Sequence, residues 1–391
     1  MKITRRCIAF LIALAALLLL NSSAQAGKKA AAKGQYLAYV GTYTTKTSSK
    51  GIYVFHFDTA TGQLSAGSVA TETPDPSWVA VHPSGKYAYA ANEAGKTSTV
   101  SAFAVDPKSG KLTLLNQIPA LGEDPCYLSF DKTGKYVLVA NYSSGTIAVF
   151  PILADGKLGE HTALMKDQGA TGPNKERQEA PHAHWIGVTP GNLFVFVADL
   201  GLDEIMMYRF DESKGSLVPH EPAFAMVDPG AGPRHIAIHP SGRFVYVVNE
   251  LKSTVTVFSS AAQKKNQPYL VLKQHISLLP KNFSGRNDAA EIAVHPNGKF
   301  LYASNRGHDS ITVFTINETK GTLTFVAGVP TGGKEPRHFA IDPTGKYLLA
   351  ENQLSNNIVV FKIDPTTGGL TPTGQVVEVP SPVDLTFVAA E

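Results

Sequence analysis

Cysteine is scarce in this sequence, which has two cysteines among 391 residues. One of them, Cys7, lies in an N-terminal segment that we expect to be removed, so Cys126 is left without a partner in the same chain. Stabilisation by intramolecular disulfide bonds is therefore excluded. The hydrophobic content of 43% is sufficient for a packed core, which must hold the fold together instead.

The sequence also lacks an excess of charge of one sign. The formal net charge is +3, and Lys2, Arg5 and Arg6 supply three cations at the N-terminus, with no acidic residue in the same segment. Without that segment the chain is close to neutral. We therefore expect neither a nucleic acid nor a membrane surface as a partner.

Several motifs of catalytic and cofactor sites are missing. The sequence contains no nucleophile elbow, phosphate-binding loop, dinucleotide fingerprint or Cys/His cluster at metal-ligand spacing. His182 and His184 form an HxH pair, which can place two imidazoles on one face of a strand, but no third ligand is near in sequence. We therefore expect no metal and no cofactor.

One hydrophobic run is long, and it lies near the N-terminus. Residues Cys7 to Leu20 form an apolar stretch of 14 residues that follows a basic start and precedes the small-residue sequence Ala24-Gln25-Ala26. This pattern predicts a secretory signal peptide at residues 1–26. The alternative, a membrane anchor, is disfavoured because the run is short for a bilayer. We expect a periplasmic or secreted protein without a membrane span, preceded by a flexible tail at residues 27–34.

A repeated unit organises the rest of the chain. It consists of a short strand, a tight turn such as HPSG, an aromatic-rich strand such as RFVYVVN, and a third strand such as STVTVF. Successive turns start 47 to 58 residues apart, which is typical of the four-stranded blades of a β-propeller. The turns start at His82, Asp131, Thr189, His239, His295 and Asp342.

The two ends of the chain supply a further blade. Near the N-terminus, QYLAYVGTYT, GIYVFHFD and GQLSAGSVA match the second, third and fourth strands of a unit that has no first strand. At the C-terminus, Ser381 to Val388 match a first strand without successors. The sequence therefore predicts one all-β domain over residues 35–391, a seven-bladed propeller closed by terminal strands that share one blade.

The hairpins predict where a site would lie. Residues eight positions before and after each turn glycine should be cross-strand neighbours, within an offset that is the same in every blade. These pairs would form a ring around one mouth of the central channel. Two long polar loops, 166–180 and 259–288, should lie over one face. The pairs are Ser77 with Glu93, Cys126 with Tyr142, His184 with Leu200, Arg234 with Glu250, Ala290 with Arg306, and Arg337 with Gln353.

This ring contains groups that suit acid–base and oxyanion chemistry. Arginines bind carboxylates, phosphates or a developing oxyanion, and a histidine is a natural general base near neutral pH. An interstrand ion pair between Arg234 and Glu250 is the structural alternative, and we expect His82, His239 and His295 of the turns to be structural. The catalytic candidates are His184, Arg234, Glu250 and Arg306, and the substrate-binding candidates are His182, Glu93, Glu291, Arg337 and Gln353.

An ordered set of motifs resembles a known family. YVGTYT, PHAHW, GPRH, VVNE, LPKNF, SNRG and EPRH occur in the order seen in seven-bladed propeller lactonases, which include bacterial 6-phosphogluconolactonases and the fungal carboxy-muconate cyclase. The resemblance implies a metal-independent site that hydrolyses or forms lactones. It places the family's histidine, first arginine, glutamate and second arginine on His184, Arg234, Glu250 and Arg306.

From these observations we expect hydrolysis of a sugar lactone. Arg234 and Arg306 would hold the oxyanion or an anionic substituent, and His184 would activate water while Glu250 orients Arg234; exchange of the last two roles is the alternative. The substrate would be an anionic or polyhydroxylated lactone. Because phosphogluconolactone is cytoplasmic, an exported enzyme would meet unphosphorylated aldonolactones instead. The rival hypotheses are a non-catalytic binding or envelope scaffold and a lactone-forming muconate cycloisomerase.

Overall fold

The computed structural model describes residues 34–260 and 270–390, and nearly all of the regular structure in them is β-strand. The predicted signal peptide and all but the last residue of the predicted tail lie outside the described residues. One short 3₁₀ helix, η1 Gly95–Thr97, is present. Within the two described ranges, no helix has the length and apolar character that a bilayer crossing requires. The prediction of an all-β fold is confirmed.

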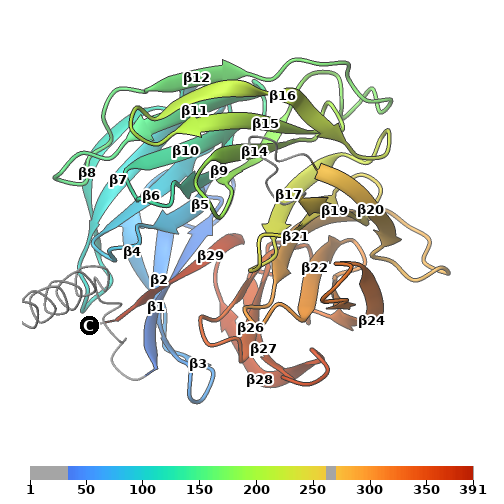
Figure 1. Cartoon of the computed structure of the whole chain (residues 1–391). Helices are drawn as coiled ribbons and strands as arrows, with labels where there is room; N and C mark the ends of the chain where they lie inside the picture. The colour runs from blue at the N-terminus through green and yellow to red at the C-terminus, as the bar shows by residue number, and fades with distance from the viewer. Residues whose placement is uncertain (1–33, 261–269, 391) are drawn as a thin grey trace, which may run out of the picture.

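The strands form seven antiparallel sheets around a central axis, as in a seven-bladed β-propeller (Figure 1). Six sheets are built from four strands that follow one another in sequence, and we number them blades 1 to 6 in chain order. Blades 1 to 3 are β5 Pro76–Val81, β6 Tyr87–Asn92, β7 Thr99–Val105 and β8 Leu112–Pro119; β9 Pro125–Phe130, β10 Tyr136–Asn141, β11 Thr146–Pro151 and β12 Ala163–Lys166; and β13 Ala183–Val188, β14 Phe194–Asp199, β15 Glu204–Asp211 and β16 Ser216–Met226.

The second half of the chain repeats this arrangement. In each blade the first strand lies nearest the axis and the fourth lies at the circumference. Blades 4 to 6 are β17 Pro233–Ile238, β18 Phe244–Asn249, β19 Thr254–Ser260 and β20 Leu270–Ser277; β21 Asp288–Val294, β22 Phe300–Arg306, β23 Ser310–Ile316 and β24 Leu323–Pro330; and β25 Pro336–Ile341, β26 Tyr347–Asn352, β27 Asn357–Ile363 and β28 Leu370–Glu378.

Blade 7 is built from both ends of the described chain. Its first strand is β29 Pro382–Ala389, which pairs antiparallel with β1 Gln35–Thr42, and β2 Gly51–Asp58 follows. Its outer strand is split into β3 Gln63–Leu64 and β4 Ser68–Glu72. Each first strand contacts the first strand of the next blade, so the ring of seven is closed. The predicted closure is confirmed.

Histidines in the turns between first and second strands link neighbouring blades. His239 Nδ1 accepts a hydrogen bond from the backbone N–H of Ser241, so the proton of the neutral ring is on Nε2. Nε2 then donates to the carbonyl of Gly298, in the turn of the next blade, at 3.0 Å. His82 and His295 make the same Nε2 contact with the following turn, at 2.8 Å each. These three histidines are structural, as expected from their position in the repeat.

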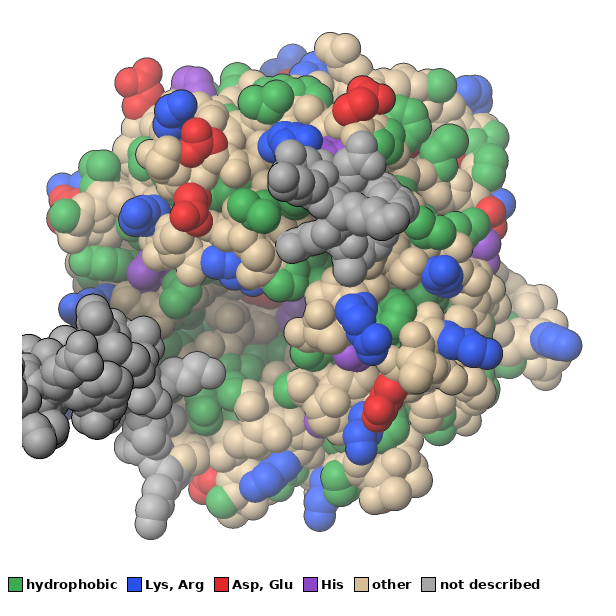
Figure 2. Space-filling model, viewed as in Figure 1, with side chains coloured by type: hydrophobic (Ala, Val, Ile, Leu, Met, Phe, Trp, Pro, Cys, Tyr) green, Lys and Arg blue, Asp and Glu red, His purple; other side chains and the backbone are tan. Residues whose placement is uncertain are grey.

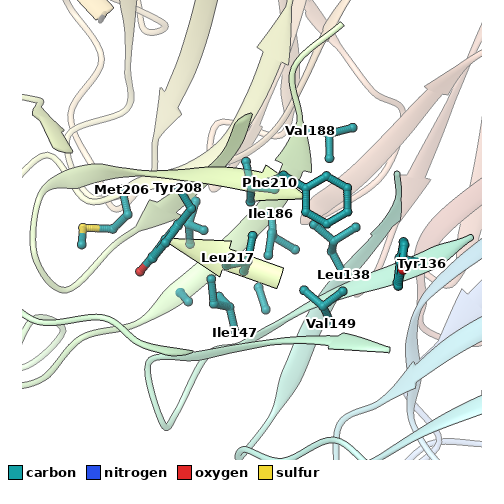
Figure 3. Close-up of a cluster of buried hydrophobic side chains, with 14 of the residues drawn as sticks. Tyr136, Leu138, Ile147, Val149, Ile186, Val188, Met206, Tyr208, Phe210 and Leu217 are labelled. Atoms are coloured by element: carbon teal, nitrogen blue, oxygen red, sulfur yellow. The ribbon is translucent and has the colours of Figure 1, made fainter. Parts of the chain in front are cut away.

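Apolar side chains fill the space between adjacent blades. Figure 3 shows one such cluster, in which Leu138 and Val149 of blade 2 pack against Ile186 and Phe210 of blade 3. Alternate residues of each strand point to opposite faces of its sheet, so every blade contributes to the clusters on both sides. The face of the molecule in Figure 2 carries charges of both signs and is hollowed near its centre.

Replacing Leu385 by Ala tests the contribution of the closing strand. Leu385 of β29 is 3% exposed and packs in a cluster with strands of blades 6 and 7. Truncating a buried leucine costs about 2–5 kcal/mol, and we expect that loss in the free energy of unfolding measured by urea denaturation. The control is Leu354→Ala, because Leu354 is 65% exposed and should change stability by less than about 0.5 kcal/mol. Equal losses for the two variants would contradict the role of β29.

Candidate active site

Every first strand carries a β-bulge near the same mouth of the channel. In blade 4, Pro233 pairs with Asn249 and His235 pairs with Val248, so Arg234 is an extra residue. In a hairpin centred on the turn glycine, residues equally far before and after that glycine would pair. Here the partner of each first-strand residue lies one residue nearer the turn, and beyond the bulge it lies two residues nearer. The shift is the same in blades 1 to 6, as expected. The bulged residues are Ser77, Cys126, His184, Arg234, Ala290, Arg337 and Val383, which we call the mouth ring.

The bulges place a second ring of side chains one residue further along. A bulge interrupts the alternation of a strand, so two consecutive side chains can face the channel. The centroid of the Trp78 ring lies 4.1 Å from the ring centroid of Tyr127, 5.4 Å from that of His235 and 5.3 Å from that of His338. These four rings come from four different blades. Such contacts are possible only near the axis, so side chains of this layer meet across the channel. It comprises Trp78, Tyr127, Trp185, His235, Glu291, His338 and Asp384, and we call it the floor ring.

A cavity of about 280 Å³ lies at the mouth. Five of the nine predicted site residues line it together, although they come from blades 1, 3, 4, 5 and 6. These five are Glu93, His184, Glu250, Arg306 and Arg337. The other lining residues are Cys126, Tyr142, Arg177, Arg286 and Asp288.

Glu250 is the centre of the charge network. Its Oε1 lies 2.5 Å from Arg177 Nη2, and its Oε2 lies 3.1 Å from Arg234 Nε and 3.0 Å from Arg306 Nη2. The Arg234 contact is an ion pair that is not aligned for a hydrogen bond. Burial raises the pKa of Glu250, but Arg306 and Arg234 outweigh burial and hold that pKa well below its usual range. Glu250 therefore stays ionised, with both oxygens occupied.

His184 is neutral at physiological pH. Burial lowers the pKa of its imidazole well below the usual value, and the nearby charge of Arg234 lowers it further. Its Nδ1 lies 3.6 Å from Cys126 Sγ, and burial raises the pKa of that thiol, so the thiol keeps its proton. The thiol can donate to the His184 carbonyl at 3.5 Å and leave sulfur to accept from Nδ1–H. In this tautomer, which we adopt for the proposed mechanism, Nε2 is the basic nitrogen.

Tyr43 connects two further site residues. Its hydroxyl donates to Glu93 Oε2 at 2.8 Å and accepts from Arg337 Nη2 at 2.9 Å, and the Arg337 guanidinium lies 5.3 Å from the tyrosine ring centre. Burial raises the pKa of Tyr43, so the phenol stays protonated and can donate. Tyr43 belongs to the YVGTYT motif of β1 and the following loop, where its role could not be read from the hairpin register.

The two long loops supply arginines that the sequence reasoning did not name. Arg177 of loop 166–180 reaches Glu250. The predicted loop 259–288 contains the end of β19 and all of β20, so only segment 278–287 is a described connection; its Arg286 lies 2.6 Å from Asp288 Oδ2 and 3.0 Å from Glu335 Oε1. Both arginines line the cavity, so loop 166–180 and segment 278–287 both reach this mouth. The polar composition of the loops was a signal for them, but it could not indicate which residue reaches inward.

Four predicted residues lie outside the cavity lining. Arg234 is buried behind Glu250, and the ring of His182 stacks on Tyr142 with centroids 4.5 Å apart. Glu291 is in the floor ring, and the backbone N–H of Gln353 donates to the Glu335 carbonyl. Arg234 is also not directly opposite Glu250 in the ladder, because the bulge places the Glu250 N–H against the carbonyl of Gly232 at 2.7 Å.

The described residues contain no group of three or more His, Cys, Asp or Glu arranged to hold a metal ion. The two histidines of the HxH pair do not face a common site. His182 Nδ1 lies 3.0 Å from the Tyr142 carbonyl and Nε2 lies 3.1 Å from Glu179 Oε1, whereas His184 faces the cavity. The two imidazoles therefore have different surroundings.

Replacing Glu250 by Gln tests the charge network through its dependence on pH. Removing one partner of a buried ion pair costs about 3–5 kcal/mol, and we expect that loss in the free energy of unfolding at pH 7. Because the native pKa is depressed below the ordinary 4.5, the stabilisation is present above that pH and declines as the pH falls toward the native pKa. The difference between wild type and variant in urea denaturation should therefore shrink below pH 4.5. Exposed Glu318→Gln is the control, and a difference independent of pH would contradict the network.

Comparisons with known proteins agree with this architecture. The family model described as "Lactonase, 7-bladed beta-propeller" matches residues 37–387. A 6-phosphogluconolactonase of Bacillus subtilis (strain 168) is 38% identical over 307 residues, which are 78% of this chain and 84% of the relative. The solved structure of a periplasmic gluconolactonase from Pseudomonas aeruginosa is 34% identical, with a TM-score of 0.84 over 91% of this chain and all of that one. The chain therefore belongs to the lactonase family of seven-bladed β-propellers.

Proposed function

We propose that the protein is an exported lactonase that hydrolyses a sugar lactone to the hydroxy acid. The observation that carries this proposal is the neutral imidazole of His184 in one cavity with a cluster of arginines that Glu250 holds in place. A neutral base and fixed positive charge are the two requirements of ester hydrolysis by water. The 6-phosphogluconolactonase and gluconolactonase relatives support the same class of reaction.

In the proposed mechanism, His184 Nε2 takes a proton from a water molecule as the water oxygen attacks the lactone carbonyl. The carbonyl π electrons move to oxygen, and the resulting oxyanion lies near Arg306, which lines the cavity. Collapse of the intermediate breaks the ring C–O bond, and the leaving alkoxide takes the proton from the imidazolium. The product is a hydroxy acid, which ionises and releases one proton to the solvent.

Glu250 is better suited to hold arginines than to activate water. Both of its oxygens are in contact with guanidinium groups, so neither is available to take a proton from water. Arg234 lies behind the cavity wall, so it would act on the oxyanion by its charge rather than by contact. We therefore assign the role of general base to His184 and direct binding of the oxyanion to Arg306. Glu250 and Arg234 would support these two residues.

The charges around the cavity favour an unphosphorylated substrate. Arg286, which lines the cavity, is already paired with Asp288 and Glu335, which reduces its attraction for a phosphate. Glu93, Asp288 and Tyr142 also line the cavity and can bind sugar hydroxyls. Aldonolactones fit this lining and also fit export. The periplasmic gluconolactonase relative is consistent with both points.

The proposed location is the periplasm or the exterior of the cell. It depends on the predicted signal peptide at residues 1–26, so the N-terminal residue of the protein purified from its native host should be Gly27. Intact-mass measurement of the native protein decides this. A mass that includes residues 1–26 would contradict export with cleavage.

Replacing His184 by Ala tests the base. Loss of a general base lowers kcat by about 10²–10⁴-fold, and we expect such a loss with glucono-δ-lactone in a pH-stat assay. The exposed His161 serves as the control, and His161→Ala should retain full activity. If His184→Ala stays active while Glu250→Gln is inactive and folded, the two roles are reversed.

The same assay separates the rival functions. Gluconolactone, phosphogluconolactone and a muconolactone are offered to the folded protein, and proton release above the spontaneous rate is measured. Release with gluconolactone supports the proposal. Release with none of them supports a binding scaffold, and release with the muconolactone alone supports the cyclising reaction, observed in its reverse direction.

A further inference from the structure

The floor ring has an aromatic half and an ionisable half. Trp78, Tyr127 and Trp185 of blades 1 to 3 pack against one another. His235, Glu291, His338 and Asp384 of blades 4 to 7 are at most 8% exposed. Buried ionisable groups are costly unless they are paired, so four of them in one layer require an explanation. The ionisable half lies next to Arg234.

We propose that Glu291 and His235 are positioning residues that hold the Arg234 guanidinium in place beneath the cavity. This inference rests on the proposed lactone hydrolysis, in which Arg234 contributes its charge from behind Glu250. Neither residue lines the cavity, so their effect on the reaction would pass through Arg234.

The hydrogen bonds fix the direction of this chain of contacts. Arg234 Nη1 lies 3.3 Å from His235 Nε2 and 2.8 Å from the Ala290 carbonyl. A guanidinium can only donate, so Nε2 accepts and the proton of the neutral ring is on Nδ1. Nδ1 lies 2.8 Å from Glu291 Oε2 and therefore donates to it. Glu291 thus selects the histidine tautomer that can accept from Arg234.

The backbone fixes Glu291 in turn. Its Oε1 accepts from the N–H of Ile292 at 3.0 Å, and its own N–H donates to Ser304 Oγ at 2.9 Å. The bulge of β21 places Ala290 and Glu291 opposite Ser304, so the carbonyl of Ala290 and the carboxylate of Glu291 reach Arg234 and His235 together. A glutamine at position 291 would have one acceptor oxygen for two donors, which are Nδ1–H of His235 and the backbone N–H of Ile292.

Arg234 is placed where a small displacement would affect both parts of the site. Its Nε lies 3.1 Å from Glu250 Oε2, and its charge is one of the causes of the low pKa of His184. The rings of His184 and His235 are 5.1 Å apart, so His235 also packs beneath the proposed base. A looser Arg234 would weaken oxyanion stabilisation without altering the cavity lining.

Ionisation of Glu291 adds a dependence on pH. Burial raises the pKa of Glu291 to about 8, although Arg234 opposes this. The other ionisable groups around it are His338, whose Nε2 lies 3.7 Å from Glu291 Oε2, Tyr127, whose pKa burial and the charge of Glu291 raise, and Arg234 and His235 themselves. Beyond His338 lie Glu351 and Asp384, and burial raises the pKa of both well above the usual range. The carboxylate form of Glu291 is the stronger acceptor, so activity should rise as the pH passes about 8.

Replacing Glu291 by Gln tests the proposal by its effect at different pH values. We expect kcat at pH 8.5 to fall by about 10–100-fold with KM nearly unchanged, as for other residues that orient a reacting group from behind. The loss should shrink below pH 7, where Glu291 of the wild type is already protonated. Asp384→Asn removes a buried acid from the same ring without contact to Arg234 and should leave kcat within about twofold across that range. Measurement of kcat and KM for glucono-δ-lactone between pH 6 and 8.5, with spontaneous hydrolysis subtracted, gives the result.

Two variants of His235 provide a second test. A glutamine can present its amide oxygen near the position of Nε2 and accept from Arg234, whereas an asparagine reaches only the position of Nδ1. When the two variants have equal thermal stability, kcat should therefore be higher for His235→Gln than for His235→Asn. Equal kcat in the two, or a loss in Glu291→Gln that does not depend on pH, overturns the proposal. A wild type that releases no protons from any lactone overturns the proposed function instead.

Discussion

A bulge in each of the seven first strands is the feature on which the site depends. A regular strand would alternate its side chains, and only every second residue would face the channel. The bulge lets two neighbouring residues do so, and the motif GPRH places Arg234 at the mouth and His235 in the floor. EPRH does the same with Arg337 and His338. The same bulge occurs in every blade and does not fix the side chain that it carries. Different blades can therefore supply a histidine, an arginine or an aromatic side chain.

The second constraint is the burial of charge. Arg234 is 3% exposed and Arg306 is 7% exposed, and neither could remain in the fold without a compensating anion. Glu250 supplies that anion to both, and Arg177 arrives from a loop to occupy its other oxygen. The carboxylate is thereby held ionised with both oxygens occupied, whereas His184, close to Arg234, is kept neutral. In the proposed reaction this one network would separate the role of Glu250 from that of His184.

The fold could be predicted from the sequence because its period is visible in the turns and in the aromatic second strands. Hairpin symmetry also identified His184, Glu250, Arg306 and Glu93, because their positions depend only on distance from a turn glycine. Arg177 and Arg286 could not be found in this way, since a loop has no register. Glu291 was predicted to bind substrate, yet it lies in the floor ring. The bulge explains this placement, because it adds a layer that a count along an ideal hairpin does not contain.

The low pKa of His184 limits how the proposed reaction can be accelerated. A general base is most effective when its pKa is near the working pH, and the burial that keeps His184 neutral also makes it a weak base. Proton abstraction alone therefore supplies a modest part of the rate. The larger part must come from fixed charge at the oxyanion, where desolvated donors act without reorganisation. A cyclic ester suits this balance, because its leaving alkoxide stays tethered and can recover the proton that His184 has taken. The arrangement of arginines behind and around Glu250 is thus the part of the site that the chemistry most requires.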